Sequence, residues 1–305
     1  MAYRMYAAKS EHPSAEEMMM RFFTTIVRLA ACFVVFTSMV HAQTSTPSPI
    51  QQLIKDVAYN ELQDRENDSF WAYRINQKIG QVSYIKHQVE TKQGPIFRIL
   101  QENDKPLTGR EERKENARLN ALLSNPSALA RNREDHLQDE ERLQRLTKLM
   151  PDAFFFEPDG PPSGDLITFR FTPNPNFKPP TFEARIFHGM AGTVEIDQRL
   201  KRFVAMHGTV INRIDFGYGL LGYVDKGGEF SVHREQVSPT RWKTNLVDVH
   251  VAGHVILFKS VSKDHHEERS KFQPVPTGIS LDEAKRLLDQ ASSQDQTSLR
   301  AGSNY

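Results

Sequence analysis

The sequence predicts a mainly antiparallel β (α+β) fold, an unclosed and strongly curved β-barrel of about 11–12 strands with a helical lid or plug. Three observations lead to this prediction. Short aromatic and β-branched runs, separated by turn residues, fill residues 151–262. Three similar runs lie between residues 69 and 100, and a charged helical segment, residues 108–150, separates the two groups.

Residues 1–42 have the features of a secretory signal peptide. An apolar run interrupted only by Arg28 ends in a small-residue motif at Ala42 that suits signal peptidase. Acidic residues precede this run, so we expect translation to begin within Met18–Met20. The sequence thus predicts an exported, periplasmic protein. The alternative is an uncleaved segment that anchors it to the inner membrane, since about 20 apolar residues can span a bilayer.

The only cysteine, Cys32, lies inside the predicted signal peptide. The stretch LAAC resembles a lipobox, but the apolar run continues past the cysteine, which argues against lipidation. A mature domain that begins after Ala42 would have no disulfide and no thiol chemistry. Residues 43–49, QTSTPSP, form a polar linker to the folded domain.

The folded domain is expected to span residues 50–262. Its first segment, IQQLIKDVAYNELQDRE, carries apolar residues at helical spacing and predicts a short helix. The next three runs are SFWAYRI, QVSYIKHQVE and PIFRIL, which predict a three-stranded meander.

The insertion of residues 108–150 predicts two charged helices with narrow apolar faces. Thr108 and Glu111 have the spacing of a capping box, and Pro126 ends the first helix. The second helix, about residues 127–149, is expected to direct four leucines inward: Leu137, Leu143, Leu146 and Leu149.

The stretches AFFF, DLITFRF, TFEARIF, GTVEID, LKRFVAMHGTVI, GYGLLGYV, EFSVHREQV, RWKTNLVDVHV and HVILFKSV all predict strands. Residues 263–305 are expected to form a polar C-terminal extension outside the sheet. In it, Ser280 and Glu283 predict the start of a short helix, and the tail is expected to be disordered.

Gly217, Gly219 and Gly222 have the G-x-G-x-x-G spacing of dinucleotide-binding loops. That motif holds a pyrophosphate only where a helix opens directly after the glycines. Here the following residues, YVDKGGEFSV, predict a turn and a strand. We therefore expect the glycines to bend a strand, and no cofactor is predicted.

The histidines invite a metal hypothesis, for which DVHVAGH is the best stretch. A two-residue hairpin at Ala252 and Gly253 would place His250 and His254 on opposite faces, so we expect no metal site there. The stretch DHHEE is expected to lie in a polar linker. No G-x-S-x-G elbow or carboxylate pair stands out, so the sequence predicts a protein that is not an enzyme.

Apolar and aromatic residues alternate along the predicted strands, so one set of them shares a face. They form either a packed core or the lining of a lipid-sized cavity under the helices. The residues in question are Ile167, Phe169, Phe171, Val194, Ile196, Phe230, Val232, Trp242, Ile256 and Phe258.

The order of these elements resembles the outer-membrane lipoprotein carrier superfamily, which has the LolA/LolB-like fold. The resemblance covers roughly residues 50–262 and is densest from HGMAGTVEID to HVILFK. It includes the Ile196-Asp197 dipeptide and a Gly-Gly hairpin ahead of a Trp-containing strand. It implies a half-barrel that holds the acyl chains of a lipoprotein, with no individual functional residue carried over.

Two functional hypotheses follow. The first is a periplasmic carrier that binds a lipid or a lipoprotein acyl chain in a hydrophobic half-barrel. The second is an envelope scaffold or protein-interaction module with a filled barrel and no ligand. With 39 basic and 38 acidic residues and no basic stripe, the sequence points to no nucleic-acid partner. A monomer is expected.

Overall fold

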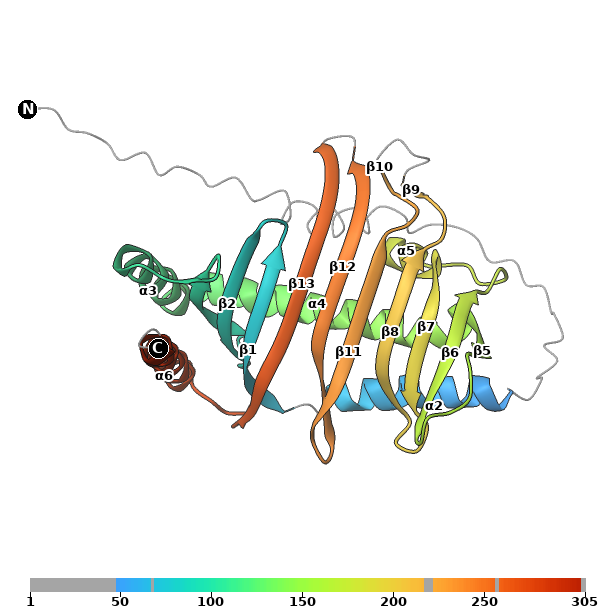
Figure 1. Ribbon diagram of the computed structural model, residues 1–305, viewed down its shortest axis with the longest axis horizontal. Helices are drawn as coiled ribbons and strands as arrows, with labels where there is room; N and C mark the ends of the chain where they lie inside the picture. Colours follow the sequence, from blue (N-terminus) through green and yellow to red (C-terminus); the bar gives the residue numbers. More distant parts are fainter. Residues whose placement is uncertain (1–47, 67–68, 217–221, 256–257, 303–305) are drawn as a thin grey trace, which may run out of the picture. The chain divides into compact units, whose positions relative to one another are not determined.

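The computed structural model describes residues 48–66, 69–216, 222–255 and 258–302. In these residues one antiparallel sheet of 13 strands is accompanied by five helices (Figure 1). The sheet does not close on itself, because its path begins at β4 and ends at β5. The prediction of a mainly antiparallel, unclosed sheet is confirmed.

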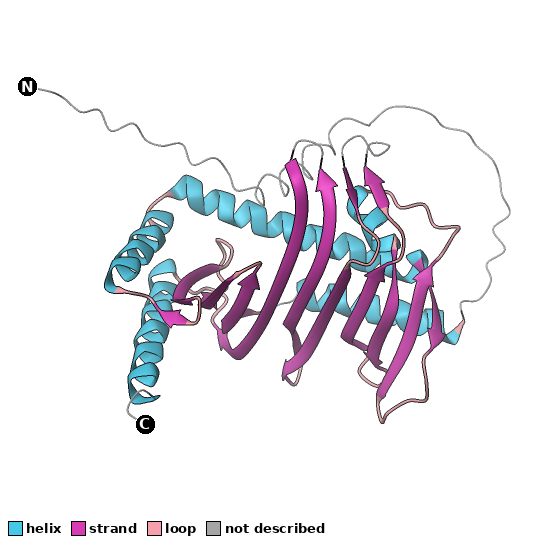
Figure 2. Ribbon diagram, turned by 45° about the horizontal axis from the view of Figure 1, so that its top comes forward, coloured by secondary structure: helices cyan, strands magenta, loops and turns pink. Residues whose placement is uncertain are grey.

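The first half of the described chain contributes three helices and the four strands at one end of the sheet. The helix α2 spans Pro49–Glu66, and β1 (Phe70–Ile79), β2 (Val82–Val89) and β3 (Ile96–Glu102) form the predicted meander. The short β4 (Lys105–Pro106) follows at the edge, and α3 (Gly109–Leu123) and α4 (Pro126–Ala153) are the two predicted helices. α4 runs across the strands in Figures 1 and 2.

The second half of the described chain returns along the sheet. Its strands are β5 (Phe154–Pro158), β6 (Leu166–Pro173), β7 (Met190–Asp197), β8 (Arg202–Val210), β9 (Ile214–Phe216), β10 (Gly222–Val224), β11 (Glu229–Ser238), β12 (Arg241–Val255) and β13 (Phe258–Val275). The order across the sheet is β4-β3-β2-β1-β13-β12-β11-β8-β7-β6-β5. The last strand therefore lies in the middle of the sheet, beside the first.

The C-terminal boundary expected from the sequence is wrong. The strand β13 continues to Val275 and pairs with β1 and β12, so residues 263–275 belong to the sheet and are no polar extension. The many charged residues in this segment suggested a segment outside the sheet. A strand can nevertheless carry polar residues on both faces when ion pairs and hydrogen bonds satisfy their polar groups. The expected short helix is the 22-residue α6 (Leu281–Gly302), where a disordered tail was predicted.

Two further local predictions are wrong. The stretch TFEARIF forms a helix, α5 (Phe182–His188), because the Thr181 hydroxyl caps it by accepting from the Ala184 amide at 3.2 Å. In α4, the predicted inward leucines Leu137 and Leu143 are each 44% exposed. Only the C-terminal part of α4, around Met150 and Ala153, reaches the core beside α2.

The two faces of the sheet are packed differently. On the inner face, α2 and the end of α4 cover β5 to β8 with a core that contains Ile54, Val57, Phe154 and Phe171. On the outer face, α6 packs on β2 and β3. Its Ala284 and Leu288 are buried in a second core together with the strand residues Ala72, Val89 and Ile96.

Candidate functional site

The residues predicted to line a cavity lie in the packed inner core. Phe169, Phe171, Val194 and Ile196 are at most 1% exposed and belong to the cluster that includes α2. Ile167 and Phe230 are half-buried against the same cluster. The predicted shared face is therefore correct for these six residues. Its space is occupied by α2, whose Ile54 and Val57 are fully buried there.

The other predicted lining residues have different positions. Val232 is half-buried on β11. Trp242 is half-buried on β12, where its carbonyl oxygen accepts from Nη2 of Arg234 at 2.9 Å. Phe258 begins β13 in register with Val255. Ile256 lies outside the described residues.

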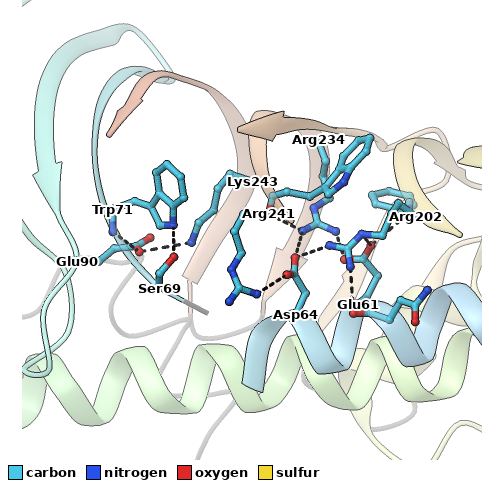
Figure 3. A network of polar contacts seen from close by, with 12 residues as sticks. Glu61, Asp64, Ser69, Trp71, Glu90, Arg202, Arg234, Arg241 and Lys243 are labelled. Carbon is cyan, nitrogen blue, oxygen red and sulfur yellow. Dashed lines mark hydrogen bonds and ion pairs between the residues drawn. The ribbon is translucent and has the colours of Figure 1, made fainter. Parts of the chain in front are cut away.

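A buried ion network joins α2 to three strands beside this core (Figure 3). Asp64 contacts Arg202 of β8 and lies 3.2 Å from Nη1 of Arg241 on β12. Glu61 is paired with Arg234 of β11 and lies 3.5 Å from Nε of Arg202. The five residues contribute three positive and two negative charges.

Local structure explains how these charges meet. Glu61 and Asp64 are three residues apart in a helix and therefore share one side of it. Arg234 follows Phe230 and Val232 in the alternation of β11, so it points to the inner face. Burial lowers the pKa of Arg234 to about 10, which leaves it charged at neutral pH. The sequence does contain one signal for this network: the charged Arg234 occupies a position of β11 where the alternation predicts an inward, apolar residue.

A second group of polar side chains lies beside this network, on the side nearer to β1. Lys243 of β12 lies 3.5 Å from the Glu90 carboxylate, which also accepts from the backbone amide of Trp71 at 3.0 Å (Figure 3). The indole nitrogen of Trp71 donates to Oγ of Ser69 at 2.9 Å. Charged side chains therefore also lie on the inner face next to β1.

The inner face of β13, β1 and β2 is also polar. The Glu267 carboxylate accepts from Nε of Arg269 and from Nε2 of Gln77, both at 2.7 Å, and Lys86 donates to Gln77 at 2.5 Å. Burial alone would raise the pKa of Glu267, but the hydrogen bond from His265 and the charge and hydrogen bond of Arg269 together lower it to about 2.

Two cavities flank α6 on the outer face. The larger, about 930 Å³, lies between α3, α6 and β3 and is lined by four carboxylates, Glu112, Glu115, Asp289 and Asp295. The smaller, about 340 Å³, lies between α6 and β1, β2 and β13. None of the residues predicted to line a lipid cavity lines either of them.

The outer face of the central strands carries a cross-strand group of acids and histidines. Nδ1 of His266 lies 3.5 Å from Asp248, and its Nε2 lies 3.3 Å from Glu268. His250 is paired with Asp264. β12 runs unbroken through Ala252 and Gly253, so the hairpin used to separate His250 from His254 does not form. Across the described ranges, no three His, Cys, Asp or Glu residues are arranged to hold a metal ion.

The glycine motif has the strand context that the sequence predicted. Gly222 begins β10, which pairs with β12 and β9, and the chain then turns at residues 225–228 into β11. Gly217 and Gly219 lie outside the described residues. The helix that a dinucleotide-binding loop needs after its last glycine does not follow Gly222.

Comparison with known proteins gives no relative for this chain: no family model, curated protein or solved structure matches it. Among the helices of the described residues, none combines the length and the apolar character needed to cross a membrane.

Proposed function

We propose that the protein is a non-catalytic module of the cell envelope that uses a filled, unclosed β-sheet as a rigid support for a partner protein. The observation that carries this proposal is the packing of α2 against the face predicted to hold a ligand. The envelope location rests on the signal peptide expected from residues 1–42.

The filled inner face favours a scaffold over a carrier. An acyl chain needs an apolar pocket of several hundred Å³. Here Phe171, Ile196 and Val57 already exclude water from the available space. Removing α2 would expose this core and separate the buried carboxylates Glu61 and Asp64 from their arginines, and both changes cost free energy.

We also propose that the sheet is a LolA/LolB-like half-barrel in which α2 and α4 form the plug. The order of the elements and the contact between the two helices support this assignment. In this arrangement the helices fill the half-barrel, because α2 shares its core with β6, β7 and β8.

The proposed partner surface is the outer face of β8, β11, β12 and β13, which we call the outer acidic face. Its carboxylates are exposed, and it suits a partner with a basic surface, because complementary charge steers association. It comprises Glu229, Asp248, Asp264 and Glu268, with the histidines His207, His250 and His266.

A carrier function is the second candidate, and the group of three arginines beside the core favours it. Arg202, Arg234 and Arg241 gather beside the apolar core, where they contact Glu61 and Asp64 of α2. A fatty acid or another anionic amphiphile would place its head group at the arginines and its chain on the apolar core if α2 moved aside.

Uptake of a fluorescent fatty acid by the delipidated protein separates the two candidates. A scaffold with a filled core should show no saturable uptake at micromolar ligand. Saturable uptake that is weakened by Arg234→Met would establish the carrier and contradict the scaffold.

Native mass spectrometry of the protein purified from its own envelope tests the partner surface. We expect a co-purifying protein that is lost from the variant Asp248→Asn/Glu268→Gln. The control Glu157→Gln/Asp282→Asn removes the same charge from exposed positions on β5 and α6 and should retain it. Equal retention by both variants would reject the outer acidic face as the binding surface.

A further inference from the structure

The smaller cavity beside α6 is lined mainly by basic and amide side chains. Its volume of about 340 Å³ is sufficient for a small ligand. The strands supply three nitrogen-bearing cationic or imidazole groups, and α6 supplies two glutamine amides and one carboxylate, Asp295, which is paired with Arg74. The polar residues that line it include Arg74, His87, Lys271, Gln273, Gln290 and Gln294.

A row of basic residues crosses three neighbouring strands under α6. Arg74 of β1 is in register with His87 of β2, which is in register with Arg98 of β3. The helix provides one acid for each arginine: Asp295 lies 2.7 Å from Arg74, and Asp289 lies 2.5 Å from Arg98. His87, in the middle, has no hydrogen bond or ion pair within the described chain.

Lys271 adds a further cation, and the backbone is bent to place it there. β13 has two residues, Lys271 and Phe272, opposite the single residue Tyr73 of β1, which makes a β-bulge. Lys271 has a φ of 57°, a conformation that costs energy for a residue other than glycine. Bulges of this kind redirect side chains. Here the bulge keeps Lys271 at the cavity, with no carboxylate partner among the described residues.

The charges around His87 favour an anion over a cation. Burial, followed by the charges of Arg74 and Lys271, lowers the pKa of His87 to about 4. The other charged groups on the packed elements are Arg98 of β3 and, on α6, Lys285, Asp289 and Asp295, and these form ion pairs. Burial is the largest cause of the lowered pKa of His87, and the positive charges of Arg74 and Lys271, which add to it, attract a negative ligand.

We propose that this cavity binds a small oxyanion, a phosphate or sulfate group, between Lys271, His87 and Arg74. The ammonium and guanidinium groups provide charge-assisted hydrogen bonds, and glutamine amides donate from α6 and β13. The larger cavity on the other side of α6 does not suit the same ligand, because its lining has four carboxylates against two basic residues, Arg98 and Lys285. This binding site is independent of the partner surface proposed above.

Isothermal titration of the protein, expressed as the full chain, with sodium sulfate and with inorganic phosphate at pH 7 tests the site. Lys271→Gln should weaken binding by about tenfold or more, the loss expected for one charge-assisted hydrogen bond. Lys78→Gln is the matched control, since Lys78 is exposed on β1 outside the cavity. Absence of binding by the wild type at millimolar anion, or equal binding by both variants, would overturn the proposal.

The pH dependence provides a second readout that a purely structural histidine would not give. A bound anion raises the pKa of His87, so sulfate should bind more tightly as the pH falls from 7 toward 5. Sulfate is used because its own charge stays constant over this range. His87→Gln should bind with the same affinity at both values. A wild-type affinity that does not change with pH would contradict a role for His87.

Vesicles distinguish a free anion from a lipid head group. If the anion belongs to a lipid, phosphatidylglycerol vesicles should bind the wild type and Lys78→Gln but not Lys271→Gln, and phosphatidylcholine vesicles should bind none. If it is free, sulfate and phosphate should bind in titration while neither vesicle does. Vesicle binding that Lys271→Gln retains would contradict the site.

Discussion

Glu61 is the residue of α2 on which the attachment of this helix to the sheet depends most directly. It is 8% exposed and pairs with Arg234, and it also lies near Arg202 and the Phe203 backbone amide. Removing one member of a buried ion group is costly because the partners remain buried with uncompensated charge. Exposed ion pairs contribute far less.

We expect Glu61→Gln to lower the free energy of unfolding by about 3 kcal/mol at pH 7, as for other buried pairs that lose one member. The matched control is Asp56→Asn on the same helix, which breaks the solvent-exposed pair with Lys201 and should change stability much less. Urea denaturation followed by circular dichroism measures both. Similar small losses in both variants would show that the network does not hold α2.

Glu267 predicts a specific acid sensitivity. Its pKa is lowered from 4.5 to about 2 in the folded protein. A depressed carboxylate pKa stabilises the fold above the unfolded-state value, and this stability is lost as the pH falls from about 4.5 to 2. The shift corresponds to about 3 kcal/mol. Unfolding free energies measured across this window should fall less steeply for Glu267→Gln than for the wild type and for the exposed-site control Glu268→Gln.

At the scale of the elements, α4 and α6 differ in how much of their apolar surface is buried. Leu288 of α6 is fully buried, and Leu137 of α4 is 44% exposed. We expect Leu288→Ala to cost about 2–5 kcal/mol, the range for buried leucines. Leu137→Ala should cost less than about 1 kcal/mol, as exposed substitutions do. Thermal and urea unfolding of the two variants checks this. Equal losses of unfolding free energy would mean that Leu137 contributes as much packing as the buried Leu288.

Helix starts were predictable because a cap is a local interaction. The Thr108 hydroxyl accepts from the Glu111 backbone amide and the Glu111 carboxylate accepts from the Thr108 amide, as their spacing predicted, and Ser280 and Glu283 do the same at α6. Alternation was less reliable. It placed Ile167, Phe169 and Phe171 on one face correctly. It failed for TFEARIF, because seven residues can match both a strand period and a capped helix.

At the scale of the whole molecule, the position of β13 decides the extent of the domain. The strand pairs with β1 over a sequence separation of about 190 residues, so it completes the sheet only after the chain has been made (Figure 1). Its loss would leave β1 and β12 each with an unpaired edge.

A chain truncated after residue 262, the boundary expected from the sequence, should therefore fail to fold cooperatively. A chain that ends at Gly302 keeps β13 and α6 and should unfold with the same midpoint as the full protein. Circular dichroism melts compare the two. A sharp, native-like transition in the shorter chain would show that the central strand is dispensable.

The candidate site shows the same limits of prediction. The apolar residues were correctly assigned to one face, but whether that face is hollow depends on α2, which lies at least 100 residues away in sequence from β6 to β8. The arginines Arg202, Arg234 and Arg241 come from three strands, and their convergence on two acids requires the register of the sheet. The basic row under α6 depends on the register of β1, β2 and β3 in the same way.

The sequence by itself determined the antiparallel β character, the two capped helices and the alternation of the strands, because each depends on residues that are near one another in the chain. Only the tertiary structure decided that α2 fills the inner face, that β13 lies at the centre of the sheet and that Arg74, His87 and Lys271 meet in a cavity under α6. These features depend on pairing and packing between distant segments, where long-range contacts and the pairing of buried charge determine the arrangement.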